Sequence, residues 1–332
     1  PPPPLRISMG SAGFEAELSP YSYFGCSVDS MDVDGDGQLE LIVGARGDAD
    51  GGFNTGAVFV IFLTATAQPP SSPPSSPSAA ASPSSTASAA TSRRLQSQSG
   101  AGGVRVLRSA KLSKGSGNLP LDAGSRFGTS LASVGDINSD GIPDLLVGVP
   151  GHGGGSGALV FLALNSDGSA AAALRISPSE WDPSVGPPVG SLPPDAHFGH
   201  AVGVAHVAGS LRIAVGAPNM NGGAGAVYML RVRLDGALEA VSALPQPAGL
   251  EPNSQFGRAL AFTADWDGNG LPELVVGAPR APEGGSERGA VYVLKLDGDG
   301  TQYYDAVKLT EEGGGRDGAR FGRAIGVSSG CS

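Results

Sequence analysis

The chain has 332 residues, of which 31 are acidic and 21 are Lys or Arg, so its formal net charge is −10. This acidity, together with the lack of a basic stripe in the sequence, argues against a nucleic-acid partner. The two cysteines are too few for a disulfide framework, and no apolar run approaches the length of a membrane span.

One unit is repeated along the chain. The dipeptide Phe-Gly occurs five times, and each of the first four copies is followed by a loop, then Val-Gly-Ala or Val-Gly-Val, then a Gly-Ala strand start. The dipeptides begin at Phe24, Phe127, Phe198, Phe256 and Phe321. With a low-complexity stretch set aside, the repeat length is about 60 residues, which is typical of radial β repetition.

Each repeat contains four short apolar runs of strand length, and none has sustained helical periodicity. A four-stranded sheet with two apolar faces cannot bury itself, so neighbouring sheets must stack around an axis. The sequence therefore predicts an all-β fold, a β-propeller of four-stranded antiparallel blades, with four blade units and partial strands at both ends.

The predicted organisation follows the repeats in chain order. Residues 1–20 form the last strand of a preceding blade and a connector, because residues 5–8 echo residues 174–177. The other predicted segments are repeat 1 (21–63), a Pro/Ser/Ala-rich insert in a hairpin tip (64–103), the last strand of blade 1 with a connector (104–126), repeat 2 (127–197), repeat 3 (198–255), repeat 4 (256–320) and the start of a further repeat (321–332). Since both ends cut through a repeat, we interpret the chain as a piece of a longer propeller.

The insert cannot form a packed core, because Pro, Ser and Ala bury too little apolar surface to offset chain entropy. Its core, residues 69–92, resembles the O-glycosylated, hydroxyproline-rich modules of plant and green-algal wall proteins. That resemblance favours an extracellular glycoprotein, and a plain linker is the alternative. Hairpin tips accept such insertions at small cost.

The repeated motifs resemble a known family. Phe-Gly, a carboxylate-rich loop and Gly-Ala-Pro at residues 216–218 and 277–279 are similar to FG-GAP repeats, the units of the integrin α-subunit head. The resemblance covers nearly the whole chain outside the insert. It implies a propeller with calcium in hairpin loops on one face and protein-contacting loops on the opposite face. The contact loops would be residues 46–55, 151–156, 219–224 and 280–288.

Three of the hairpin loops place oxygen ligands at positions 1, 3, 5 and 9, with Gly at position 6, a pattern that suits Ca²⁺. An EF-hand needs an acid at position 12, where these loops have Val43, Val147 and Val276. By resemblance the backbone carbonyl at position 7 is the further ligand. The candidate ligands are Asp32, Asp34, Asp36, Gln38 and Glu40; Asp136, Asn138, Asp140, Ile142 and Asp144; and Asp265, Asp267, Asn269, Leu271 and Glu273. We expect about three Ca²⁺ ions, and ordinary hairpin turns are the alternative.

The third repeat has no carboxylate in the equivalent stretch, residues 207–212, so a blade is expected to form without the ion. Two other features allow opposing interpretations. The tripeptide at residues 46–48 spells Arg-Gly-Asp, which is either a recognised ligand motif or a chance match within a repeat. Cys26 and Cys331 are expected to lie buried in different blades or to pair with residues outside the chain.

These observations predict a calcium-stabilised module for cell adhesion or protein recognition, extracellular or at the cell surface, binding a protein ligand or partner subunit and performing no catalysis itself. One alternative is an accessory propeller of a larger extracellular enzyme acting on phospholipids or glycans. Another is a carbohydrate-binding propeller, although the two tryptophans, Trp181 and Trp266, are too few for a sugar-binding platform in every blade. Trp266, inside an acidic loop, is the best exposed-aromatic candidate.

Overall fold

The computed structural model describes residues 6–10, 13–65, 104–180, 192–283, 285–310 and 316–326. Sixteen strands in these residues form four antiparallel sheets of four, each with its strands in chain order. The first sheet contains β1 (Phe24–Met31), β2 (Glu40–Ala45), β3 (Ala57–Ala65) and β4 (Val104–Ser113). The second contains β5 (Ser130–Gly135), β6 (Asp144–Val149), β7 (Ala158–Leu164) and β8 (Ala170–Ile176).

The third sheet contains β9 (Ala201–Val207), β10 (Ser210–Ala217), β11 (Ala226–Arg233) and β12 (Leu238–Ala243). The fourth contains β13 (Ala259–Phe262), β14 (Leu274–Ala278), β15 (Ala290–Leu296) and β16 (Tyr303–Leu309). The prediction of an all-β propeller with four-stranded antiparallel blades is confirmed.

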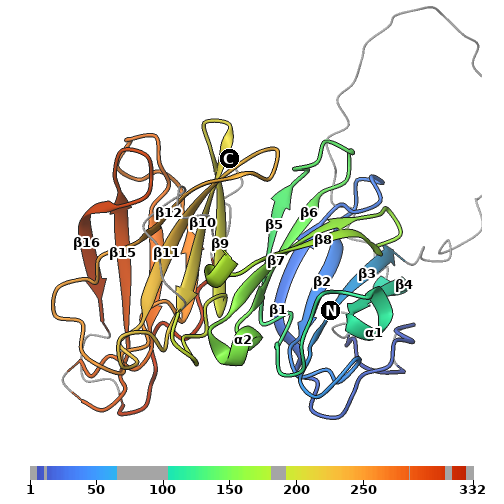
Figure 1. Cartoon of the computed structure of the whole chain (residues 1–332), viewed down its shortest axis with the longest axis horizontal. Coiled ribbons are helices and arrows are strands. Elements are labelled where there is room, and N and C mark those ends of the chain that lie inside the picture. The colour runs from blue at the N-terminus through green and yellow to red at the C-terminus, as the bar shows by residue number, and fades with distance from the viewer. Residues whose placement is uncertain are drawn as a thin grey trace, which may run out of the picture.

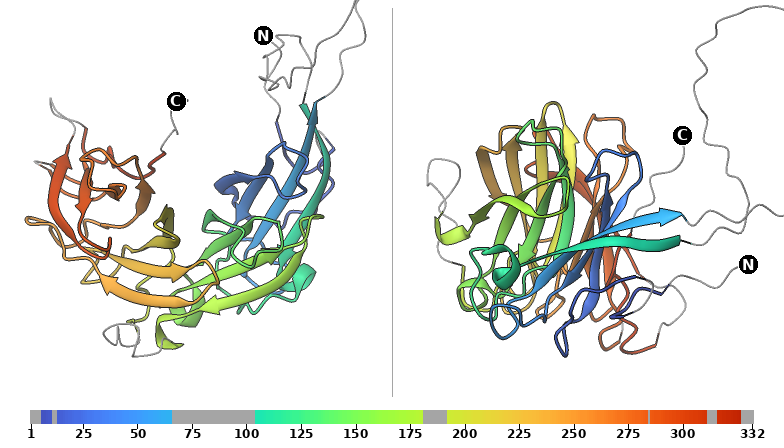
Figure 2. Two further views of the ribbon diagram at one scale, coloured as in Figure 1. Left: turned by 90° about the horizontal axis from the view of Figure 1, so that it is seen from above. Right: turned by 90° about the vertical axis from the view of Figure 1, so that its right-hand side faces the viewer.

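The four blades stand side by side in an open arc (Figures 1 and 2). The first strands of neighbouring blades contact one another, β1 with β5, β5 with β9 and β9 with β13. The last strands β8 and β16 are much more exposed than their buried neighbours β7 and β15. The first strands therefore line the inner side of the arc, as in a propeller.

The helices in the described residues are the short turns α1 (Lys114–Gly117) and α2 (His152–Gly155) and a 3₁₀ turn at Pro178–Glu180. None of them has the length or apolar character that a membrane crossing requires. The strands that flank the predicted insert, β3 and β4, pair with each other as a hairpin. Residues 66–103 lie outside the described residues.

Three apolar cores hold the blades together, and each takes in the Phe of a Phe-Gly dipeptide. Phe127 lies in the core between blades 1 and 2, Phe198 between blades 2 and 3, and Phe256 between blades 3 and 4. All three side chains are fully buried. Burying one aromatic side chain of this size contributes on the order of 2–3 kcal/mol, so the Phe of each dipeptide stabilises the packing of two neighbouring blades.

A backbone joint beside each Phe explains the glycines of the motif. The Gly that opens the third strand forms a parallel bridge with the Phe of the next repeat, in the pairs Gly56–Phe127, Gly157–Phe198, Gly225–Phe256 and Gly289–Phe321. A Cβ on any of these glycines would collide with the backbone of the partner Phe. The next-to-last residue of the second strand is also a glycine packed against the next Phe-Gly. A Cβ on Gly148, for example, would collide with the carbonyl of Gly199. The repeat keeps glycine where two backbones touch.

The segment before blade 1 packs against that blade. Residues 6–8 have no regular secondary structure, and their assignment to a preceding blade stays a prediction. The fully buried Phe14 packs against Phe24 and Phe59 of blade 1, with ring centroids 5.3 and 5.7 Å away. This segment covers the face of the blade 1 sheet that points away from blade 2.

Candidate metal sites

The three acidic loops connect the first and second strands of blades 1, 2 and 4. They begin where β1, β5 and β13 end, so they lie at the end of the inner strands opposite the Phe-Gly dipeptides. Position 6 of each loop is Gly37, Gly141 or Gly270, with φ of +83°, +88° and +87°. The tight reversal that these glycines permit turns the flanking carboxylates toward one another.

In the loops of blades 1 and 4, three carboxylates converge. Asp32, Asp34 and Glu40 each place an oxygen within 4.8 Å of the others, and so do Asp265, Asp267 and Glu273. Within the described residues, no other group of three His, Cys, Asp or Glu side chains meets this spacing. Three carboxylates at this distance repel one another in the absence of a cation.

The acid at position 1 also organises the loop backbone. Asp32 accepts hydrogen bonds from the amides of Gly35 and Gly37, at 2.8 and 3.0 Å. Asp265 accepts from Gly268 and Gly270, each at 2.8 Å. Asx turns of this kind occur in ordinary hairpins too, so the discriminating feature lies elsewhere in the loop.

That feature is the acid at position 9, which is buried in all three loops. Glu40, Asp144 and Glu273 are 2%, 1% and 1% exposed. One oxygen of each accepts the amide at position 2, at 2.6 Å from Val33, 2.9 Å from Ile137 and 2.8 Å from Trp266. The other oxygen of Asp144 and of Glu273 is buried without a hydrogen-bond partner in the described residues. A buried carboxylate oxygen without a partner is costly, and a hard cation would satisfy it.

The surroundings of the ninth position disfavour a negative charge. Burial raises the pKa of Glu40, and the charges of Asp34 and Asp32 raise this pKa further. Burial likewise raises the pKa of Asp144, with Asp140 and Asp136 adding to it. In both loops the ionised form is disfavoured by its surroundings, which is the condition that Ca²⁺ would reverse.

The loop of blade 2 has an amide in place of one acid. Asn138 donates to Asp140 at 2.9 Å, and Asp140 accepts the amide of Ile142 at 2.8 Å. The position-7 amides of the other loops make the corresponding contacts, Gln38 with Asp36 at 2.7 Å and Leu271 with Asn269 at 2.8 Å. The loops therefore share these backbone contacts. Three predicted ligands converge in the loops of blades 1 and 4, whereas the acids of the blade 2 loop, Asp136, Asp140 and Asp144, do not meet the same spacing.

The third repeat shows the same hairpin without acids. Ser210 pairs with Val207, and the turn between them is only Ala208 and Gly209, both with positive φ. The blade is complete around this short turn. The longer acidic loops are therefore not required to form a blade.

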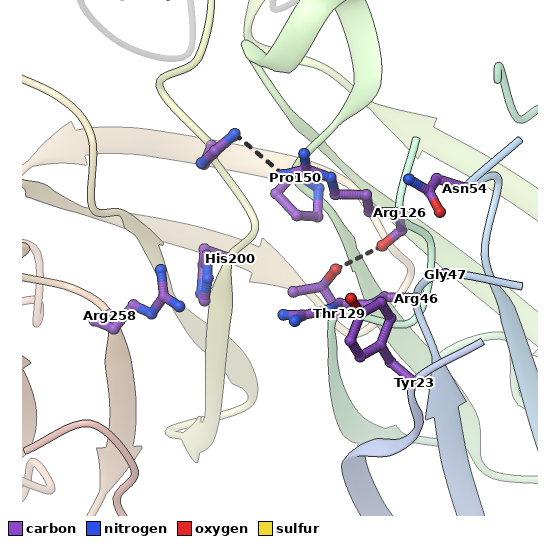
Figure 3. Close-up of a pocket in the computed structure, with 10 residues that line it drawn as sticks. Tyr23, Arg46, Gly47, Asn54, Arg126, Thr129, Pro150, His200 and Arg258 are labelled. Carbon is purple, nitrogen blue, oxygen red and sulfur yellow. Dashed lines mark hydrogen bonds between the residues drawn. The ribbon is translucent and has the colours of Figure 1, made fainter. Parts of the chain in front are cut away.

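At the opposite end of the inner strands lies a cavity of about 310 Å³ (Figure 3). Its lining includes three arginines, Arg46, Arg126 and Arg258, and two histidines, His197 and His200. The sequence analysis missed this site, because its members come from four repeats. The available signal was their common position: they flank Phe-Gly or follow Gly-Ala.

His200 makes the cavity sensitive to acid. Burial, with the charge of Arg258 next, lowers the pKa of His200 to about 3. The unfolded chain would bind this proton near pH 6.5, so the stability contributed by neutral His200 is lost as pH falls below that value. Between about pH 7 and pH 5 the loss is about 2 kcal/mol. We expect urea unfolding in calcium to show a smaller acid loss for His200→Gln than for the unchanged chain. Equal losses in the two proteins would contradict this role.

The structure decides two smaller questions. Asp48 of the Arg-Gly-Asp tripeptide is fully buried and pairs with Lys111 at 2.9 Å, so the tripeptide cannot be presented as a ligand. Cys26 is exposed on β1, where burial was one of the two expectations, and its Sγ donates to the carbonyl of Gly128 at 3.3 Å. Cys331 and Trp181 lie outside the described residues, and Trp266 is 65% exposed.

Comparison with known proteins points to the same repeats. The FG-GAP repeat family matches residues 127–162 and 256–294. Integrin alpha-PS5 of Drosophila melanogaster is 30% identical over 260 residues, which cover 78% of this chain and 15% of the relative. Human integrin alpha-7 is 36% identical over 160 residues, 46% of this chain and 12% of the relative.

A relative of another kind matches as well. The phosphatidylinositol-glycan-specific phospholipase D of Bos taurus is 31% identical over 196 residues, 56% of this chain and 22% of the relative. The matched segments thus span less than a quarter of the length of each of these three relatives.

At each contact between neighbouring blades, a Phe-Gly dipeptide meets a glycine of the preceding blade. Together with the family match, this repeated contact identifies a β-propeller built from FG-GAP repeats. The chain is an FG-GAP repeat protein. It resembles the integrin alpha subunits over most of its length.

Proposed function

We propose that this chain is a calcium-binding propeller module that recognises a protein ligand or partner subunit in cell adhesion, outside the cell or at its surface. The main support for the proposed calcium sites is the buried acid at position 9 of the loops. In Asp144 and Glu273, one oxygen accepts a hydrogen bond from a loop amide, and the other is buried beside further acids with no partner among the described residues.

The proposed ligands are the side chains at positions 1, 3, 5 and 9 and the carbonyls of Gln38, Ile142 and Leu271. Bound Ca²⁺ would neutralise the loop and fix its conformation. Millimolar extracellular calcium would fill loops of modest affinity, whereas cytosolic calcium would not, which supports the proposed location.

Recognition would use the loops at the Phe-Gly end, residues 46–55, 151–156, 219–224 and 280–288. They lie on the face opposite the acidic loops and vary in sequence while the strands below them repeat. The similarity to integrin alpha subunits supports a protein partner. We propose a binding role in place of catalysis, because the repeated motifs serve the joints between blades.

The test of the metal sites is a calorimetric titration of the chain with Ca²⁺. We expect about three sites, since three loops carry the pattern. Replacing Asp34, Asp140 and Asp267 together with Ala should abolish the heat of binding. Asp235→Ala, in the exposed β11–β12 turn, is the matched control and should leave the titration unchanged. Absence of binding, or binding that survives the triple replacement, would refute the proposal.

The second candidate function is that of an accessory propeller in a larger enzyme, which the similarity to phospholipase D supports. Both candidates use the same calcium loops, so the titration does not separate them. They differ in what the recognition face binds: a protein in the first case, and the enzyme's own domain or substrate in the second.

A further inference from the structure

Six arginines gather at the Phe-Gly end of the inner strands, although the chain as a whole is acidic. Arg46, Arg126 and Arg258 line the cavity of Figure 3. Arg258 also lines an adjoining pocket of about 90 Å³ together with Arg280, Arg320 and Arg323. We call these six residues and the space between them the arginine cavity. Among the described residues, no Asp or Glu side chain lines either pocket.

The positive charge of the arginine cavity is largely unbalanced within the described residues. Glu287 pairs with Arg280 at 3.2 Å and with Arg320 at 2.7 Å. The remaining four arginines form no ion pair with an acid in the described part of the chain; Arg126 approaches His197 at 3.4 Å, and Arg46 stacks over Tyr23 at 4.9 Å. Six arginines against one glutamate leave five positive charges.

Arg258 lies at the centre of this repulsion. The residue is half-buried, and burial together with the charges of Arg46, Arg323, Arg280 and Arg320 lowers the pKa of its guanidinium to about 10. Such a shift means that the fold holds this cation against an unfavourable field. An anion placed between the arginines would remove the cost and convert repulsion into charge-assisted hydrogen bonds.

A second observation points to a ligand at the same place. His200 lies in the cavity beside Arg258 (Figure 3), and its Nδ1 is buried without a hydrogen-bond partner in the described residues. A neutral imidazole can donate from either nitrogen, depending on its tautomer. His200 therefore has a buried ring nitrogen that no described residue satisfies, and it lies next to the Arg258 guanidinium, which has no acid partner in the described part of the chain.

The chemistry of arginine limits the classes of ligand that suit the cavity. All six are arginines, whose planar forks bind a carboxylate through two parallel hydrogen bonds. They come from different blades and line two adjoining pockets that share Arg258, so they suit a group that inserts at one point. A long sulfated polymer would be met better by a basic stripe along an open surface.

We propose that the arginine cavity binds the carboxylates of an acidic peptide segment carried by a protein partner. This inference rests on the proposed protein-recognition function and specifies the charge of the segment that the recognition face accepts. The variable loops at residues 46–55 and 280–288 begin at Arg46 and Arg280, so they would form the rim around the inserted segment.

The test measures fluorescence anisotropy of labelled hexaglutamate with the whole chain, in calcium at physiological ionic strength, with hexaglutamine as the neutral probe. We expect hexaglutamate to bind at least about 10-fold more tightly, because each lost charge-assisted hydrogen bond costs roughly that factor. Replacing Arg46 and Arg258 with Gln should weaken hexaglutamate binding by about 10-fold or more. Replacing Arg105 and Arg175, on the outer strands β4 and β8, removes the same charge and should change the affinity less than twofold.

Equal binding of the two probes, or equal loss in the cavity variant and the outer-strand control, would overturn the proposal. So would a heparin-type oligosaccharide that binds the cavity more tightly than hexaglutamate, since the site would then take a sulfated glycan. Circular dichroism checks that each variant is folded, and Arg46→Gln alone serves if the double variant is not. Calcium binding with no hexaglutamate binding would reject only this inference, whereas hexaglutamate binding without calcium binding would reject the metal sites of the proposed function.

Discussion

Chelation of calcium is expected to lower the free energy of unfolding by about 8 kcal/mol at a calcium concentration 100 times the dissociation constant, because each of three sites contributes about 2.7 kcal/mol there. The physical reason is the combination of converging acids and buried position-9 oxygens, which cost free energy in the absence of the ion. Urea unfolding in calcium and in EGTA measures the difference. Fluorescence of Trp266, which lies in the blade 4 loop and is 65% exposed, reports locally on that loop.

Variants assign this effect to the loops. Asp267→Ala should remove about one third of the calcium-dependent stability, since one of three equal sites is lost. In EGTA the same variant should be close to the unchanged chain, because removing a charge also relieves repulsion within the loop. Ser210→Ala, beside the acid-free turn of blade 3, removes hydrogen bonds with Val207 and Arg212, so it should lower stability equally in calcium and EGTA and leave their difference unchanged. Identical unfolding in calcium and EGTA would show that the loops act only as hairpin turns.

The blade architecture could be predicted from the sequence because its determinants are local and repeated. Phe198 and Gly157 each meet the neighbouring blade through their own backbone or ring, so each repeat needs the same residue at the same place. The acidic hairpins could be predicted for the same reason. The burial of the ninth acid was not visible in the sequence, because Asp144 begins β6 and Glu273 directly precedes β14, and the packing of both strands depends on neighbouring blades.

The arginine cavity could not be predicted, because no short segment contains it. Arg46 and Arg258 belong to blades 1 and 4 and approach one another only through the curvature of the arc.

The tripeptide at residues 46–48 shows the opposite problem, a motif that the sequence suggests and the structure excludes. Its letters match a ligand motif, yet tertiary packing buries Asp48 against Lys111. Short matches carry no information about exposure.

The two ends of the inner strands have opposite charge. Each first strand runs from a Phe-Gly dipeptide toward the hairpin loop, so the arginines lie at its start and the acids at its end, as β13 lies between Arg258 and Asp265. Calcium would neutralise the acidic face and leave the arginine cavity as the strongest remaining field. Occupied metal sites would therefore favour an acidic partner on the opposite face, without any change of shape.

Gly157→Ala is expected to destabilise the chain by roughly 3–5 kcal/mol, because it combines overpacking with a left-handed backbone. Gly157 has φ of +94°, and a Cβ there would collide with the backbone of Phe198 at the joint between blades 2 and 3. Gly236→Ala is the matched control: its φ is +81°, but no atom lies within 4 Å of the added Cβ. The control should lose only about 1–2 kcal/mol, the cost of the left-handed backbone. Urea unfolding in calcium compares the two. If both variants lose the same stability, the close approach of the blades is not what requires glycine, and the repeated motif would need another physical explanation.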